Sequence, residues 1–470
     1  IGSGLVGSEM CIRDRLYVMA GFASGTWILH GKEYRVDTLY HAYIGPGTTQ
    51  TSIKLAGPVN LRVFYTTTDL KNENVDVRAI KHKDTLTGLG TVSNAAESHS
   101  TSNRSYFAGI NADFFSSSMP CGITVVDGEV YCSDQASGWS LFGIDANKIP
   151  YSGGGDFYVK LTAPDYSTAE LSAMNLERET NGLVLYSSRK GANTGTDSNG
   201  SEVVLIPDGE GNFLTPGATV RMRVQGNPSH AGSMPIPDDG YILSGSGTKE
   251  SFVSNLSECD VVEVRCAIRF NGFTGGKIQQ ALGGCPMLVS GGKVLDTENA
   301  LDHLTSAQPR TAVGYNAEKN KLVMLVADGR SSISVGPISK VLADIMIYAG
   351  CSEAMNFDGG GSSTFYVKGE GVINQPSDGS ERSVTDGLYL STDAPQNDVT
   401  ITTIRFMDYA KTLNQGDAYT PVIYGYNQYG VLVDRNVEGV TLSCGSSLGT
   451  ITNDLSLIHI SEPTRPEPIS

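Results

Sequence analysis

The chain has 470 residues with a hydrophobic content of 39%, and its 34 basic and 50 acidic side chains give a formal net charge of -16. This length predicts two or three domains, and the apolar content is sufficient for sizeable cores and excludes wholesale disorder. The acidic excess argues against a general nucleic-acid-binding protein, which would carry a basic face, and no apolar run approaches the ~20 residues that a membrane-spanning helix needs.

The sequences of the two ends indicate segments that were introduced during assembly of the sequence and are not natural protein, and we call these segments scars. Residues Met10–Asp14 can be encoded by ATGTGTATAAGAGAC, whose reverse complement, read one frame over, encodes Ser456–His459. Two ends of a natural gene have no physical reason to be reverse complements, and both segments resemble a translated transposon-end adapter of sequencing libraries. We therefore predict scars over residues 1–15 and 455–470 and leave both out of the fold.

Residues 16–37 are predicted to lead into the first domain. Within them, Leu16–Gly25 fits either the end of an apolar export signal that closes on small residues or a buried strand, and the sequence leaves both interpretations open. If the natural start is missing, attachment to a cell surface through that start is also open.

Residues 38–393 alternate short strand-like runs with turns rich in Gly, Asn and Asp, which predicts one large domain of many strands and few helices. Asn60–Tyr65 is one such strand. Leu288–Leu295 is a predicted hairpin, because the Gly-Gly pair in its middle supplies the positive φ angles of a tight turn. Cys121 and Cys132 flank a second predicted hairpin, where one disulfide is an option for an exported protein.

Two helices are predicted, at Ser167–Asn175 and at Pro337–Ala349, where apolar residues recur at helical spacing after a proline and before a glycine. Asp393–Asp398 is a predicted linker. Residues 394–454 beyond it alternate apolar and polar positions without a helix, which predicts a partial, all-β immunoglobulin-like domain that serves as a spacer or binding module.

Two aspartates follow the strands on either side of the second helix. Lys321–Ala327 ends at Asp328 and Glu353–Phe357 ends at Asp358, and the crossover between them has the length of a parallel βαβ unit. If the strands are parallel neighbours, both carboxylates emerge at the same sheet edge, where α/β sheets usually place ligands. The alternative interpretation is a pair of turn-forming Asp-Gly dipeptides.

A glycine-rich string follows the second aspartate and consists of Gly359, Gly360 and Gly361, then Ser362 and Ser363. Consecutive glycines allow a close approach of the backbone to a ligand, and their N–H groups can converge on an anion. The two serines would add hydroxyl donors, so the string is a candidate substrate-binding loop.

Further polar residues flank strand-like runs. Asn111 and Asp113 follow an apolar run, and the alternative to a site there is an Asx turn. Arg310 and Thr311 open another run, where the arginine could bind a phosphate bidentately or form a surface ion pair.

Four segments occur in one order that resembles the phosphodiester glycosidase family: Gly109–Asn111 with Phe114-Phe115, Arg310–Gly314, Val326–Arg330 and Asn356–Ser363. The similarity spans about residues 61 to 389, and Gly283-Gly284, Pro286, Arg382 and Leu388-Tyr389 also suit the family's pattern. Asp113 departs from that pattern, which has a small residue there, so a catalytic role for it is not expected.

The resemblance implies a secreted, periplasmic or cell-surface enzyme with an α+β, mixed-sheet catalytic domain. It would hydrolyse the glycosidic bond of a sugar phosphodiester in a host glycan or in a surface glycan, such as a teichoic-acid-like, capsular or other exopolysaccharide polymer, and release a free sugar, with N-acetylglucosamine as one candidate. The reaction needs a carboxylate at the anomeric carbon and donors for the departing phosphate.

We expect Asp358 and Asp328 to supply the carboxylates, without deciding which is nucleophile or base, and we expect no metal or other cofactor. The expected substrate-binding residues are Asn111, Arg310, Thr311, Arg330, Gly359, Gly360, Gly361, Ser362 and Ser363.

Two alternatives stay open from the sequence. Asp328, Asp358 and Asn111 could bind Ca²⁺ or Mg²⁺, which prefer oxygen ligands, in a metal-dependent phosphodiesterase. A non-catalytic surface protein that binds glycans is the second alternative, although only Trp27 and Trp139 could stack on sugars.

Overall fold

The fold is known from a computed structural model, which describes residues 25–134, 138–209, 213–270, 273, 275–296, 305–407 and 418–440, together with the backbone of 450–451 and 457–458. This part of the chain is mostly β-sheet with few helices, as predicted. Among the described residues, no helix is both long and apolar enough to cross a membrane.

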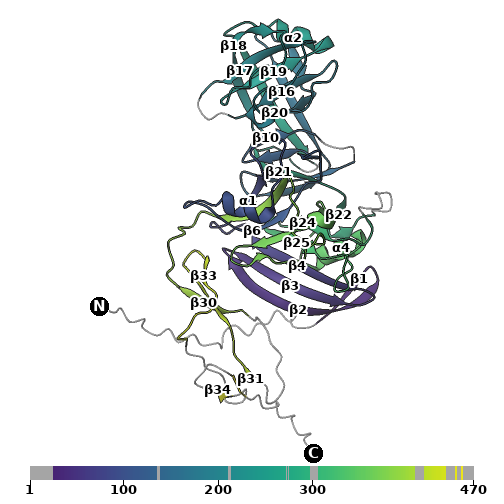
Figure 1. Cartoon of the computed structure of the whole chain (residues 1–470), viewed down its shortest axis with the longest axis vertical. Helices are drawn as coiled ribbons and strands as arrows, with labels where there is room; N and C mark the ends of the chain where they lie inside the picture. The colour runs from purple at the N-terminus through teal and green to yellow at the C-terminus, as the bar shows by residue number, and fades with distance from the viewer. Residues whose placement is uncertain are drawn as a thin grey trace, which may run out of the picture.

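A nine-stranded antiparallel sheet forms the base of the molecule (Figure 1). In spatial order its strands are β1 (Gly25–Leu29), β2 (Lys32–Gly45), β3 (Thr48–Ala56), β4 (Asn60–Asp69), β25 (Lys321–Ala327), β24 (Arg310–Tyr315), β26 (Glu353–Asn356), β22 (Met287–Ser290) and β23 (Lys293–Val294). Helix α4 (Ser339–Tyr348) covers one face, where Leu342, Ile345 and Met346 pack against Leu325 and other buried residues of the sheet. The described part of the predicted lead-in, from Gly25, is paired in this sheet.

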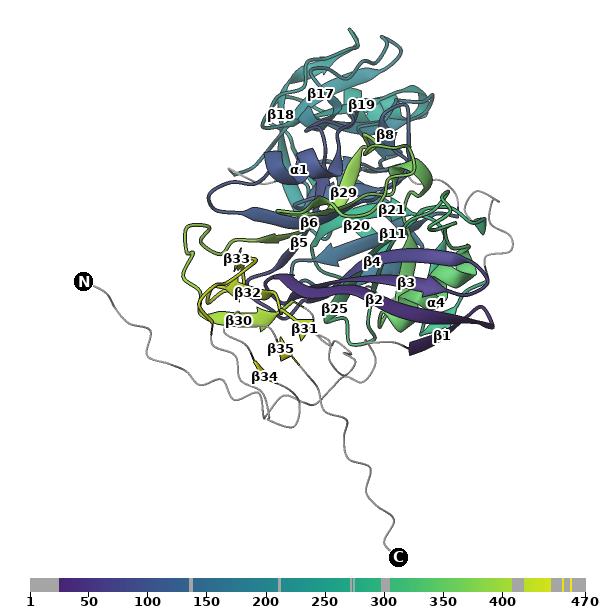
Figure 2. The same cartoon turned by 60° about the horizontal axis from the view of Figure 1, so that its bottom comes forward.

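A five-stranded sheet packs on the other face. It consists of β28 (Gly371–Val372), β27 (Phe365–Val367), β6 (Ser105–Asn111), β29 (Asp386–Thr392) and β5 (Asp76–Lys81). Phe64, Met324 and Val326 of the large sheet share a core with Ile110 and Leu388 of this one. Helix α1 (Val92–Ser98) packs on β6, and Figure 2 shows β5, β6 and β29 between β2–β4 and α1.

Two further sheets form what we call the upper lobe. One contains β10 (Glu129–Cys132), β9 (Thr124–Val126), β21 (Ile278–Gly284), β11 (Ser140–Asp145) and β12 (Pro150–Gly153). The other contains β14 (Thr168–Glu170), β13 (Gly155–Thr162), β20 (Val261–Phe270), β18 (Thr219–Ser229), β17 (Ser201–Pro207), β19 (Tyr241–Gly245), β16 (Leu183–Ser187) and β15 (Ala173–Met174), with α2 (Glu250–Ser254) beside it. Both sheets share one apolar core.

Several predicted elements are confirmed. The strand at residues 60–65 is part of β4, and the helix at residues 337–349 is α4. The predicted hairpins are β22–β23, with φ of 56° and 73° at Gly291 and Gly292, and β9–β10, with its turn at Asp127 and Gly128. Cys121 and Cys132 beside the second hairpin are free thiols.

The helix predicted at residues 167–175 is wrong, because this segment forms β14 and β15. Ala169 and Met174 are buried in the upper-lobe core, and the side chains on both sides of Ala169 are exposed, which is the period of a strand. Pairing with β13 and β16 therefore overrides the weak local helical pattern.

The expectation that β25 and β26 are parallel neighbours is also wrong, because β24 lies between them and pairs antiparallel with each. Two strands that are both antiparallel to a third run in the same direction. Asp328 and Asp358, which follow β25 and β26, therefore still emerge at the same edge of the sheet, as the sequence predicts.

The C-terminal segment forms a three-stranded sheet of β30 (Thr403–Phe406), β32 (Ile423–Tyr426) and β33 (Leu432–Asp434), and a second one of β31 (Ala418–Tyr419), β35 (Leu457–Ile458) and β34 (Thr450–Ile451). Tyr426 Oη donates to Tyr43 O at 2.9 Å, which ties this segment to β2. The immunoglobulin-like assignment stays a prediction, as do the two scars, which lie almost wholly outside the described residues.

Candidate functional site

The loop after β26 carries the predicted site and is held between the ends of β6 and β24. Asp358 N donates to Ala112 O at 2.8 Å, just beyond β6, and Gly360 N donates to Pro309 O at 2.9 Å, just before β24. Gly360–Ser362 then form a single 3-10 turn, for which Gly360 adopts a φ of 60°. Backbone hydrogen bonds from two separate sheets therefore fix the conformation of the loop.

Asn111 is the main side-chain support of this loop. It is fully buried, and its Nδ2 donates to Asp358 O at 2.7 Å. Its Oδ1 accepts from Thr311 Oγ1 at 2.8 Å and from Thr364 N at 3.1 Å. The structure thus places Asn111 and Thr311 beneath the loop, and their predicted contact with substrate stays a prediction.

Three arginines surround the glycines of the loop. A Cβ on Gly359 would lie 2.7 Å from Pro309 O, just before Arg310, and one on Gly360 would lie 3.0 Å from a guanidinium nitrogen of Arg330. A Cβ on Gly361 would overlap the Arg382 guanidinium. A side chain at Gly359 is therefore opposed by the Pro309 carbonyl and one at Gly360 by its positive φ, whereas one at Gly361 would displace the ends of the Arg382 and Asp378 side chains.

Arg310 is nearly fully buried, and its guanidinium donates to Ser306 O. Burial and the nearby charge of Arg330 lower the pKa of Arg310 to about 10, against the opposing effect of Asp358. Arg330 itself is exposed and donates to Gln308 Oε1 at 2.7 Å. A cation that is both desolvated and close to a like charge favours a bound anion.

Asp358 is the carboxylate at the centre of this arrangement and is only partly covered from solvent. Burial raises its pKa to about 6, while the hydrogen bond from Ser362 and the charge of Arg382 oppose the rise. Arg382 also donates to Ser362 Oγ at 3.3 Å and forms an ion pair with Asp378 at 2.6 Å. At neutral pH the Asp358 carboxyl is therefore mainly ionised but weakly solvated, which suits a nucleophile or base.

Asp328 lies at the same edge of the sheet as Asp358, but it contacts different residues. Its Oδ1 accepts from Gln375 N at 2.9 Å and lies 3.4 Å from Asn374 Nδ2, and burial raises its pKa to about 6. Asn374 in turn donates to Ser363 O at 3.0 Å. Asp328 therefore anchors the segment that backs the end of the loop, and the charge that acts on it is Arg62, not an arginine of the loop.

A buried acidic group behind the loop was not predicted. Asp113 N donates to Asp386 Oδ1 at 2.9 Å, and a Cβ on Gly283 would lie 2.6 Å from the Asp113 carboxylate. Burial and the charge of Asp386 hold the pKa of Asp113 well above its usual range. Lys81 compensates for part of this charge and donates to Thr385 O at 3.1 Å.

Arg382, Asp386 and Lys81 are the functional candidates that sequence reasoning missed as site residues, whereas Asp113 was considered and a catalytic role for it was not expected. In the sequence, Arg382 was noted only as part of the pattern of the phosphodiester glycosidase family and not as a site residue. Charged residues at the ends of apolar runs were the available signal for Lys81 and Asp386. Their pairing across β5 and β29 depends on strand register, which local sequence does not contain.

The oxygen ligands proposed for Ca²⁺ or Mg²⁺ have hydrogen-bond partners of their own, and the metal site stays a prediction. Asn111 Oδ1 already accepts two hydrogen bonds, and Asp328 and Asp358 hold separate partners. Within the described ranges, no group of three or more His, Cys, Asp or Glu side chains is arranged to hold a metal ion.

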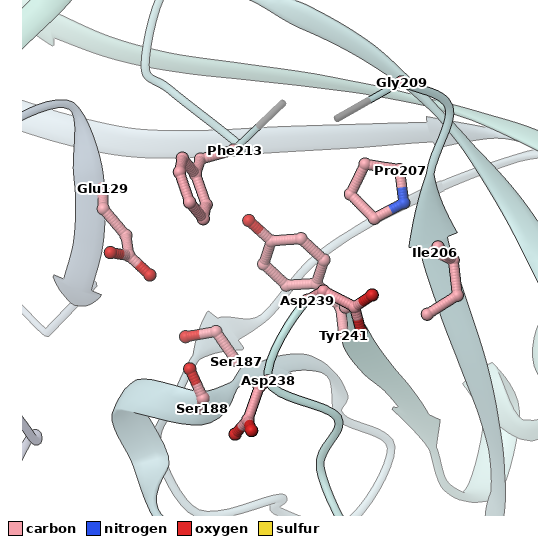
Figure 3. A pocket seen from close by; sticks show the side chains of 11 residues that line it. Glu129, Ser187, Ser188, Ile206, Pro207, Gly209, Phe213, Asp238, Asp239 and Tyr241 are labelled. Atoms are coloured by element: carbon pink, nitrogen blue, oxygen red, sulfur yellow. The ribbon is translucent and has the colours of Figure 1, made fainter. Parts of the chain in front are cut away.

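The upper lobe contains a cleft of about 470 Å³ between β10, β16, β17 and β19. Figure 3 shows the carboxylates of Glu129, Asp238 and Asp239 around the ring of Tyr241. Phe213, with 51% of its surface exposed, closes one side. Among the described side chains that line this cleft are three acids and no lysine or arginine, although Arg189 pairs with Glu129 at 2.7 Å, so the cleft suits a phosphate less well than the loop does.

Residues 215–391 match the family model described as phosphodiester glycosidase. The match confirms the resemblance found in the sequence, over less than half of the chain. It includes Arg310, Asp328, the loop at residues 358–363 and Arg382, whereas Asn111 lies before it.

The chain is also 40% identical over 88 residues to the uncharacterised SPbeta prophage-derived protein YomE of Bacillus subtilis. The aligned segment covers 19% of this chain and 13% of YomE, so most of that protein has no counterpart in the match.

Three solved structures are similar. A Synechocystis protein described as hypothetical has a TM-score of 0.57 and 15% identity, over 74% of this chain and 62% of that one. A Burkholderia pseudomallei protein described as exported has a TM-score of 0.53 and 21% identity, over 70% and 74% of the two chains. The catalytic domain of zebrafish N-acetylglucosamine-1-phosphodiester alpha-N-acetylglucosaminidase has a TM-score of 0.41 and 13% identity, over 75% and 87%. At these identities, the two higher TM-scores show a shared fold alone.

Proposed function

We propose that the phosphodiester glycosidase segment at residues 215–391, completed by β6, is the catalytic centre of a hydrolase that cleaves a sugar phosphodiester at its glycosidic bond and releases the free sugar. The observation that carries this proposal is the position of Asp358. Its partly exposed carboxyl lies on a glycine loop that is surrounded by Arg310, Arg330 and Arg382.

The arginines supply the phosphate-binding part of the site. Burial and, after it, the charge of Arg330 lower the pKa of Arg310, and a phosphodiester anion between the two arginines would offset both effects. Arg382 is held by Asp378 and lies beside Gly361. Guanidinium groups bind phosphate oxygens bidentately, and they would also stabilise the charge that grows on the phosphate as it departs.

Asp358 supplies the carboxylate at the anomeric carbon, either as a nucleophile that forms a glycosyl-enzyme or as a base that activates water. A phosphate monoester departs readily, so the leaving group needs little acid assistance. We assign Asp328 to the support of Asn374 and Gln375, because its Oδ1 accepts from Gln375 N and lies beside Asn374 Nδ2. Asn111 and Thr311 position the loop from below.

The substrate that fits this chemistry is a glycan phosphodiester of a bacterial surface, such as a teichoic-acid-like or capsular polymer, with N-acetylglucosamine as one candidate sugar. Export supports contact with such a polymer, and one structural neighbour is described as exported.

The test is turnover of a panel of UDP-sugars and sugar 1-phosphodiesters by the full chain, by Asp358→Asn and by Asp165→Asn, a carboxylate on an exposed turn of the upper lobe. We expect release of free sugar that Asp358→Asn lowers by about 10²–10⁴-fold, that Asp165→Asn leaves unchanged and that EDTA does not affect. Release that EDTA abolishes would favour a metal-dependent phosphodiesterase. Binding without release from any panel member would favour a glycan-binding protein.

A further inference from the structure

We propose that a cleft beside Trp139 binds neutral saccharide units attached to the sugar that is released at Asp358. The substrate class is then an oligosaccharide or polysaccharide phosphodiester, and not a phosphodiester of a single sugar. The bond that is cleaved rests on the function proposed above, whereas the binding of saccharide by the cleft can be measured without turnover.

This cleft has a volume of about 570 Å³, which is within the range of small-molecule sites. The rings of Trp139 and Phe157 contribute to its walls, together with the carboxylates of Asp134 and Asp156. Gly154 forms part of the lining, and a Cβ there would meet nothing within 4 Å, so the space beside it is open.

The cleft lies close to the candidate catalytic loop. The ring of Trp139 packs edge-on against Phe114 with centroids 5.0 Å apart, and Phe114 O accepts from Cys121 N at 2.8 Å. Burial and surrounding carboxylates, among them Asp134 of the cleft and Asp358 of the loop, raise the pKa of the Cys121 thiol to about 11. Asp358 N donates to Ala112 O at 2.8 Å, and Phe114 follows Ala112 by two residues, so the cleft and the loop are neighbours.

The charges of the cleft and of the loop favour different parts of a substrate. The charged side chains that line the cleft are acidic, whereas the loop is surrounded by arginines. A phosphate is repelled by the exposed carboxylate of Asp134 and attracted by the arginines of the loop, whereas the charge of Asp156 is offset by an ion pair with Arg269 at 3.5 Å. A neutral sugar suits the cleft, because its C–H face can stack on an aromatic ring and its hydroxyls can donate to the carboxylates.

This charge pattern orients the substrate across Asp358. The phosphate and its aglycone lie toward the arginines, and the sugar at Asp358 extends toward Trp139. Additional sugar units on the released side would then occupy the cleft. The rings of Trp139 and Phe157 are half-buried, whereas Asp134 and Asp156 are exposed and lie outside the apolar core, so the packing of the fold does not require these two carboxylates.

The first test uses the two tryptophans of the chain. Trp27 stacks on Tyr348 at 4.6 Å at the far edge of the nine-stranded sheet, so Trp27→Phe leaves Trp139 as the only source of indole emission. This variant is titrated with maltotriose, cellotriose, mannotriose and N,N′,N″-triacetylchitotriose, and separately with inorganic phosphate. We expect a saturable change in emission with at least one trisaccharide, and no emission change with any of the four would overturn the proposal.

The second test measures affinity in the same background. Asp134→Asn and Phe157→Ala should each weaken the trisaccharide by about tenfold, as expected for a residue central to an interface. Tyr166→Ala removes an aromatic ring that is 86% exposed elsewhere in the upper lobe, and it should leave the affinity unchanged. Equal affinities for all three variants would overturn the proposal, provided that their melting temperatures show intact folds.

The third test separates this inference from the proposed function. The full chain should hydrolyse a sugar 1-phosphodiester that carries two further sugars with a higher kcat/KM than its single-sugar analogue, and Trp139→Ala or Trp139→Phe should reduce that ratio. If the kcat/KM of the longer substrate relative to that of the single-sugar analogue is the same in all proteins, the saccharide cleft is refuted and the proposed hydrolase activity is not. Trisaccharide binding without turnover of any substrate would refute the hydrolase and leave the cleft intact.

Discussion

Replacement of Asn111 by alanine tests the construction of the candidate site independently of its activity. The substitution removes the acceptor of Thr311 Oγ1 and Thr364 N and the donor to Asp358 O. Thr311 keeps an alternative partner, because its Oγ1 lies 3.2 Å from Ser363 Oγ. The buried Thr364 N–H and the part-buried Asp358 carbonyl are left without a side-chain partner.

Each buried polar group that loses its partner costs about 1–3 kcal/mol, so Asn111→Ala should lower the free energy of unfolding by about 2–6 kcal/mol. Thr311→Val is the matched control, since it removes only one hydroxyl while Asn111 Oδ1 keeps the bond from Thr364 N. This control should cost about 1 kcal/mol.

The assay combines urea unfolding with hydrogen exchange measured on peptides. Asn111→Ala should accelerate exchange in a peptide that spans residues 356–366, and exchange in β18 of the upper lobe should not change. If Asn111→Ala destabilises the protein no more than Thr311→Val does, Asn111 is not the support that holds the loop, and our reasoning about the site is refuted.

Three further predictions follow from contacts at the site. Gly361→Ala should abolish stabilisation by inorganic phosphate in thermal melts, because its Cβ would overlap the Arg382 guanidinium, whereas Gly154→Ala, which has open space, should retain it. The raised pKa of Asp358, about 6 against a usual 3.8, means that the folded protein binds more protons than the unfolded one between these values. The stability that the Asp358 carboxyl contributes should therefore be present below pH 4 and be lost as the pH rises through 6. The free energy of unfolding in urea should vary less with pH across this window for Asp358→Asn than for the parent protein. An equal variation in the two proteins would contradict this prediction. Lys81→Met should destabilise the protein by about 3–5 kcal/mol in the same assay, because two buried carboxylates lose their cation, and a loss below 1 kcal/mol would count against that pairing.

Much of the local structure could be predicted because it depends on residues that are close in sequence. The spacing of Leu342, Ile345 and Met346 produces α4, and Gly291 and Gly292 produce the β22–β23 turn, since only the local chain must adopt these conformations. The order of the family motifs likewise identified the loop at residues 358–363 without any coordinates. The helix predicted at residues 167–175 failed because strand pairing and burial determined the conformation there.

The sequence by itself therefore determined the strand-rich class, the α4 helix, two hairpins and the resemblance of the loop to a phosphodiester glycosidase. The tertiary structure decided that β24 lies between β25 and β26, that Asp328 serves Asn374 while Asp358 faces the arginines, and that Asn111 supports the loop. The Asn111–Asp358 hydrogen bond joins residues 247 positions apart. Contacts of this kind depend on how distant strands align, and because local propensity and spacing do not encode that alignment, only the folded chain reveals them.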